Sequence, residues 1–112
     1  MRELTSIQIA ALERLLGQGF YPMMIPLYAN FIGVRRNAYG VLLAPVEGGG
    51  FCFFGDACYL IDGNLSVLVR RAEREWFVWK SKQVEATPEL LAERKRFSEE
   101  LARLLAAAPC PA

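Results

Sequence analysis

The hydrophobic positions near the start of the chain recur with the period of an α-helix, about 3.6 residues. Thr5 and Gln8 have the spacing of a capping box, in which each side chain satisfies a backbone N–H of the other residue. Gly17 suits a helix end because glycine readily adopts the left-handed backbone conformation. We therefore expect a helix over residues 6–16. Its apolar stripe consists of Ile9, Leu12, Leu15 and Leu16.

A second helix pattern occupies the C-terminal part of the chain. Thr87 is a suitable N-cap, and Pro88 suits the first helical position, where its fixed φ favours the helix and its missing N–H costs no hydrogen bond. Nothing in residues 107–112, which are mostly alanine and proline, predicts an anchor, so we expect a flexible tail there. The apolar stripe of this helix consists of Leu90, Phe97, Leu101, Leu104 and Leu105.

Between the two helices the pattern changes to short apolar runs separated by turn residues. Residues 18–27 contain Pro22 and Pro26, which are expected to prevent regular strand pairing there. Short turns favour antiparallel strands, because parallel strands would need long crossover connections. We therefore predict an α+β fold in a single domain, 1–112, with an antiparallel meander of about five or six strands between the helices and the C-terminal helix packed on one face. The runs read LYANFIGV, YGVLLAPV, FCFF, CYLI, LSVLV and EWFVW, with QVEA as a short last strand.

The stretch over residues 48–64, GGGFCFFGDACYLIDGN, raises the question of a metal, redox or phosphate site. The Gly-Asp pair at residues 55–56 fits a two-residue hairpin turn. In such a hairpin Cys58 lies on the face of Phe53, whereas Cys52 lies on the opposite face. The two thiols then share neither a disulfide nor a metal ion. We therefore interpret each cysteine as a small buried apolar residue.

The three glycines at 48–50 precede a strand rather than a helix, and no Lys-Ser or Lys-Thr pair follows them. A phosphate-binding loop needs both the helix N-terminus and that lysine. We interpret these glycines as a flexible hairpin loop.

Strand alternation, with a turn at Glu73 and Arg74 that pairs Val69 with Val78, assigns the side chains of the sheet to two faces. Both faces are apolar, whereas a sheet with one solvated side alternates apolar and polar residues. The two helices can cover one face. We expect either a second copy of the chain on the other face or a sheet that curls around a small core or pocket. One face carries Phe51, Phe53, Cys58, Leu60, Leu65, Val67, Val69 and Val78; the other carries Cys52, Phe54, Tyr59, Ile61, Leu68, Phe77 and Trp79, with Ser66 and Arg70 among them.

The composition restricts the chemistry and adds to the case for a partner. Hydrophobic residues make up 54% of the chain, a high share for a small domain that has little interior. The 112 residues include no histidine, which excludes Ser–His and Cys–His nucleophile pairs and removes the commonest metal ligand. We therefore expect a non-enzymatic protein with no catalytic residue, no metal site and no cofactor.

Charge and cysteine content bear on partners and location. The net charge is +1, and residues 35–82 carry seven Lys/Arg against five Asp/Glu, a net of +2, which is too little for a basic nucleic-acid-binding stripe. The uncharged run from Leu15 to Val34 is interrupted by prolines, which argues against a membrane helix. Three cysteines without a Cys-x-x-Cys pair, and an N-terminus unlike a signal peptide, predict a reduced, cytoplasmic protein.

These observations favour an interaction or assembly module that forms a homodimer or binds another protein. The alternative is a domain that binds a small apolar ligand or lipid; single-stranded nucleic-acid binding is a third, weaker hypothesis. We expect the partner or ligand surface to lie on the second sheet face. The candidate residues for that surface are Tyr59, Leu68, Arg70, Phe77 and Trp79.

Overall fold

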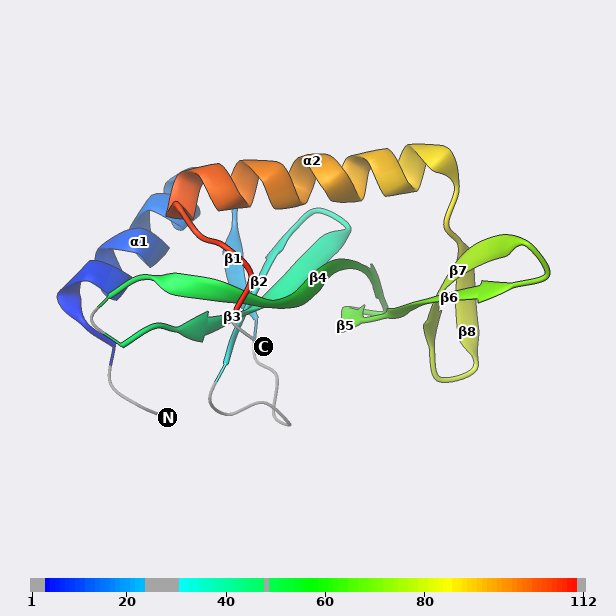
Figure 1. Cartoon of the computed structure of the whole chain (residues 1–112), viewed down its shortest axis with the longest axis horizontal. Coiled ribbons are helices and arrows are strands. Elements are labelled where there is room, and N and C mark those ends of the chain that lie inside the picture. The colour runs from blue at the N-terminus through cyan, green and yellow to red at the C-terminus, as the bar shows by residue number, and fades with distance from the viewer. Residues whose placement is uncertain (1–3, 24–30, 48, 111–112) are drawn as a thin grey trace.

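The protein has an α+β fold in a computed structural model that describes residues 4–23, 31–47 and 49–110 (Figure 1). A five-stranded antiparallel sheet has the order β1-β2-β3-β4-β5, and a separate three-stranded antiparallel sheet has the order β6-β7-β8. The predicted single meander is therefore divided into two sheets. The elements are α1 (Ser6–Gly17), β1 (Tyr21–Met23), β2 (Ile32–Arg36), β3 (Tyr39–Pro45), β4 (Phe51–Ile61), β5 (Asn64–Leu65), β6 (Val67–Arg71), β7 (Arg74–Trp79), β8 (Lys82–Glu85) and α2 (Pro88–Leu105).

Both predicted helices form where the capping residues placed them. Thr5 and Gln8 make the reciprocal bonds of a capping box, and the Thr87 side chain accepts a hydrogen bond from the backbone N–H of Leu90. The long helix α2 runs beside both sheets, and α1 lies near its C-terminal end (Figure 1). The molecule is correspondingly elongated, 46 × 27 × 26 Å.

The main core lies between the two helices and one face of the five-stranded sheet. Phe20, Leu43 and Leu101 are fully buried there, and a buried Gln8 donates hydrogen bonds to the carbonyl oxygens of Val46 and Gly50 at 3.2 and 3.0 Å. Gln8 thus fastens the loop between β3 and β4 to α1. The buried residues of this core are Ala11, Leu15, Phe20, Ile32, Val34, Tyr39, Val41, Leu43, Phe51, Ala57, Phe97, Leu101 and Leu105.

The prediction that prolines prevent pairing in residues 18–27 is wrong for its described part. Residues 21–23 form β1, in which Pro22 is the partner of Val34. The strand lies at the edge of the sheet, where a proline can be accommodated because one side of the strand needs no partner. Pro26 lies outside the described residues.

The predicted hairpin turn at residues 55–56 is also wrong, because β4 continues through it. Residues 51–59 of β4 lie along β3, with Cys58 opposite Gly40 and Phe54 opposite Leu42, so β4 contains two extra residues at this point. Gly55 has φ +78°, and this left-handed conformation serves a bulge instead of a turn.

This bulge changes the predicted faces only before residue 55. Phe51 and Phe53 lie on the helix-covered face with Tyr59, whereas Cys52 and Phe54 lie on the opposite face with Cys58. The predicted assignment of residues 51–54 is therefore inverted. That of Tyr59, Leu60 and the later strand residues agrees with the register.

The hairpin between β6 and β7 turns one residue earlier than predicted. Ala72 and Glu73, with φ of 50° and 67°, occupy the turn, and Val69 pairs with Trp76 instead of Val78. Two left-handed residues match the right-handed twist of the flanking strands. The shift does not exchange the faces, because Val69 and Val78 still point to the same side.

The three-stranded sheet has a small core of its own. Phe77 is 0% exposed and packs with Ile61 and Ala86. The first turn of α2 covers this cluster through Leu90 and Leu91. The two sheets are thus joined by the connection from β5 to β6, by α2 and by the packing of Tyr59 and Ile61 of β4 against this cluster.

The expectation that nothing anchors the C-terminal residues is wrong for residues 107–110. The Phe53 N–H donates to the Ala108 carbonyl at 3.0 Å, and the Cys110 N–H donates to the Phe53 carbonyl at 2.8 Å. A disulfide also joins Cys52 to Cys110, which corrects the interpretation of Cys52 as an isolated buried thiol. Pairing rules for residues 51–61 could not reveal this bond, because its second partner lies 58 residues further along the chain.

Candidate functional site

Four of the five residues predicted to form the partner surface pack in the small core around Phe77. They are Tyr59, Leu68, Phe77 and Trp79. Tyr59 stacks on Phe77 with ring centroids 5.4 Å apart, and Leu68 and Trp79 pack against the same cluster. In a single chain Phe77 therefore faces inward. Arg70 lies exposed on β6 opposite Glu75.

The opposite face of the three-stranded sheet is uncovered among the described residues, and we call it the open face. It consists of Val67, Val69, Trp76 and Val78, which the strand register places on one side. Val67 is 64% exposed, Val69, Trp76 and Val78 are partly exposed, and none of the four residues packs in either core cluster. An uncovered apolar surface that includes a tryptophan is typical of an interaction site.

Polar and charged residues of both signs surround the open face. Arg74 Nη1 lies 3.6 Å from Glu85 Oε1, and Arg71 donates a hydrogen bond to Gln83 Oε1 at 3.2 Å. These four side chains lie on the strands of the open face, next to its apolar centre. An apolar centre with a polar rim is the usual composition of a protein interface.

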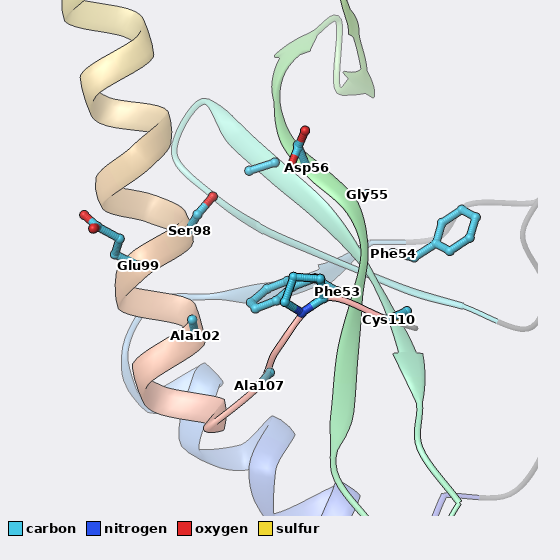
Figure 2. Close-up of a pocket in the computed structure, with 11 residues that line it drawn as sticks. Phe53, Phe54, Gly55, Asp56, Ser98, Glu99, Ala102, Ala107 and Cys110 are labelled. Carbon is cyan, nitrogen blue, oxygen red and sulfur yellow. The ribbon is translucent and has the colours of Figure 1, made fainter. Parts of the chain in front are cut away.

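A groove lies on the other side of the molecule, between α2, the bulge of β4 and the C-terminal segment (Figure 2). Its volume is about 520 Å³. Ala57 is buried at its base, and the small side chains of Ala102 and Ala107 leave the space open. The disulfide-bonded Cys110 and the neighbouring Pro109 form one wall.

Acidic groups line the groove without partners in the described part of the chain. Asp56 comes from the β4 bulge and Glu99 from α2, and neither carboxylate makes an ion pair or side-chain hydrogen bond among residues 4–23, 31–47 and 49–110. The lining includes the Ser98 hydroxyl and no Lys or Arg. The electrostatic character of the groove is therefore negative.

The adjacent carboxylate, Glu100, has a structural role instead. Arg36 donates two hydrogen bonds to it, at 2.9 and 2.6 Å, and the guanidinium lies 4.0 Å from the centre of the Phe20 ring. These hydrogen bonds lower the pKa of Glu100 below its usual value. The pair ties β2 to α2 across the main core.

Tyr39 also links the sheet to α2. Its hydroxyl lies 2.8 Å from the Leu90 carbonyl oxygen and 3.2 Å from a Glu93 carboxylate oxygen. Burial raises the pKa of Tyr39, and the negative charge of Glu93 raises it further. A phenol held protonated in this way acts as a hydrogen-bond donor and is a poor base.

One cysteine, Cys58, remains outside the disulfide. Burial raises the pKa of the free Cys58 thiol, which keeps it protonated and weakly nucleophilic at neutral pH. No cluster of metal-ligating side chains occurs in the portion of the chain that the structure describes. None of the helices described is long and apolar enough to cross a membrane.

No protein-family model, curated protein or solved structure matches this chain. The open face could be predicted from the sequence, because strand alternation alone places Val67, Val69 and Val78 on the same side of the sheet. The groove was not, because it depends on a bulge and on the return of the C-terminal segment to β4.

Proposed function

We propose that this protein is a non-enzymatic assembly module that forms a homodimer through the open face. The observation that carries the proposal is the apolar face formed by Val67, Val69, Trp76 and Val78, on which Val67 is exposed and the other three side chains are partly exposed. Removing this surface from water is favourable, at roughly 25 cal/mol per Å² of apolar area buried. A second copy supplies an apolar surface of the same shape.

The charges around the open face favour a second copy over a strongly charged partner. A two-fold interface places the same patch on both subunits, so the patch must be complementary to itself. A rim that carries both Arg74 and Glu85 meets this requirement.

Light scattering coupled to size-exclusion chromatography tests the proposal. We expect the wild-type chain to elute at twice 12.6 kDa and the Val67→Glu variant at 12.6 kDa. Val67 is 64% exposed, so the charge disrupts the dimer and not the fold. The matched control is Ile9→Glu on α1, where the side chain is 47% exposed, and it should remain dimeric. A monomeric wild type, or a Val67→Glu variant that stays dimeric, would contradict the proposal.

Binding of a small apolar ligand is the second candidate function. The groove, at about 520 Å³, falls within the range of small-molecule sites, and its base is apolar. Native mass spectrometry of the purified protein should then reveal a bound mass. A ligand-free mass in every preparation would contradict this candidate.

We further propose that the protein resides in the cytoplasm, as its cysteine pattern and N-terminal residues predict. Disulfides are reduced in that compartment, so Cys52 and Cys110 would be thiols there and would pair on exposure to oxidant. Alkylation in intact cells should then modify Cys52 and Cys110. Protection of both from alkylation until a reductant is added would instead place the protein in an oxidising compartment.

A further inference from the structure

We propose that the groove between α2 and β4 binds a short extended peptide that carries a basic side chain, by strand addition to the open edge of β4. This site lies apart from the open face and does not depend on the dimer. Three features of the described residues support it: an unpaired strand edge, an extended segment already bound to that edge, and unpaired negative charge beside it.

The first feature is the gap along the outer edge of β4. The C-terminal segment pairs with this edge at Phe53, and β5 pairs with it at Leu60 and Ile61. Between them, no strand in the described part of the chain lies against residues 54–58, whereas the Tyr59 carbonyl already accepts hydrogen bonds from Ser66. At about 3.3 Å per residue these five positions span roughly 16 Å, enough for a peptide of about five residues. Unpaired strand edges are common docking sites for extended peptides.

The second feature is the C-terminal segment, which shows the strand direction that a peptide can adopt along this edge of β4. Residues 108–110 run parallel to β4, and both backbone groups of Phe53 bond to them, at 3.0 and 2.8 Å. This edge of β4 therefore accepts an extended segment. The bulge at Gly55 interrupts the regular ladder, so we expect few backbone hydrogen bonds and a larger contribution from side chains.

The third feature is the charge of the groove, which favours a basic side chain in the bound peptide. Helix α2 stands beside the open edge and contributes Ser98 and Ala102 to the groove, while the exposed Glu99 side chain lies at its rim and points away from β4 in Figure 2. Asp56 and Glu99 bring two carboxylates without a basic partner, whereas Glu100 is already paired with Arg36. A guanidinium or ammonium group supplies the complementary charge, and its alkyl stem fits against the apolar base.

Fluorescence anisotropy with a labelled pentapeptide of sequence Val-Val-Arg-Val-Val tests the proposal. We expect it to bind at least about tenfold more tightly than the same peptide with a central glutamate. Asp56→Asn combined with Glu99→Gln should remove this preference. Glu13→Gln on α1 removes an exposed carboxylate elsewhere and should leave the preference intact. Equal binding of the two peptides, or a preference that survives the double substitution, would overturn the proposal.

Two further measurements locate the site. Ala102→Phe fills the groove from α2 and should abolish binding while the dimer mass and helical circular dichroism stay unchanged. In the wild-type protein the backbone amide signals of Gly55 and Ala57 should shift on titration with the arginine peptide. Arginine amide that binds as tightly as the peptide would replace strand addition with a small-cation site. Amide shifts confined to β6–β8 would refute the location while leaving the dimer proposal untouched.

Discussion

The two sheets differ in how much of the chain covers them. The five-stranded sheet has α1 and α2 on one face and a core of thirteen buried apolar residues. The three-stranded sheet has only the first turns of α2 on one face and a core of three buried residues, Ile61, Phe77 and Ala86. Its other face is the open face. One face of the larger sheet is thus covered by both helices, whereas the smaller sheet depends on few internal contacts.

This difference indicates where a partner contributes most. A small domain has limited material for covering its apolar surface, and here that material is concentrated over the larger sheet. A second copy on the open face would bury Trp76 and its neighbours and add the layer that the three-stranded sheet lacks. Formation of the dimer would then also raise the unfolding free energy of β6–β8.

The largest expected effect comes from removing the centre of the smaller core. Phe77→Ala should cost about 3–5 kcal/mol, as for other fully buried phenylalanines. Because the cluster around Phe77 is small, we expect loss of hydrogen-exchange protection in β6–β8 while β2 and β3 remain protected. Phe20→Ala, at an equally buried position in the main core, should instead lower protection throughout. Equal loss of protection in both variants would show that the two regions unfold as one unit.

The next effect concerns the disulfide that encloses the smaller sheet in its loop. Cys52 and Cys110 are 58 residues apart, and reducing the bond should lower the unfolding free energy by about 2–4 kcal/mol. Urea denaturation with and without dithiothreitol measures the change. Cys58→Ser, which leaves the bond intact, serves as the control. An unchanged urea midpoint after reduction would mean that the bond does not form in the folded protein.

The smallest effect is the pH-dependent contribution of Glu100 to the larger region. Its folded pKa is lowered by Arg36, so the stabilisation is present above the unfolded pKa of about 4.3 and is lost as the pH falls through the folded value. Glu100→Gln should cost at most about 1 kcal/mol at pH 7, because the pair is partly exposed. The difference from wild type should vanish in acid. Urea titrations at several pH values measure this difference, and a difference that persists in acid would contradict the assigned role of the Arg36–Glu100 pair.

Local signals were sufficient to predict most elements. Capping at Thr5 and Thr87 located both helices, and alternation after residue 58 assigned the faces correctly. The errors arose where one local sequence pattern is compatible with two different backbone structures. A glycine with positive φ is compatible with a turn or a bulge, and Gly55 forms a bulge because β3 pairs with β4 on both sides of it, at Phe54 and at Cys58.

The candidate sites show a similar division. The open face follows from alternation within one hairpin, whereas the groove needs contacts between residues far apart in sequence. Ala107 and Cys110 reach β4 only because α2 directs the chain back to it, and the disulfide holds them there. Residues 107–112 carry no pattern that indicates such a contact.

The most direct test of the central claim is the accessibility of Trp76 as a function of protein concentration. In a Trp79→Phe variant, Trp76 is the only tryptophan that remains. If the open face binds a second copy, acrylamide quenching of its fluorescence should decrease as the mass measured in parallel rises from 12.6 kDa to twice that value. A doubled mass with unchanged quenching, or a 12.6 kDa mass at every concentration, would contradict the account.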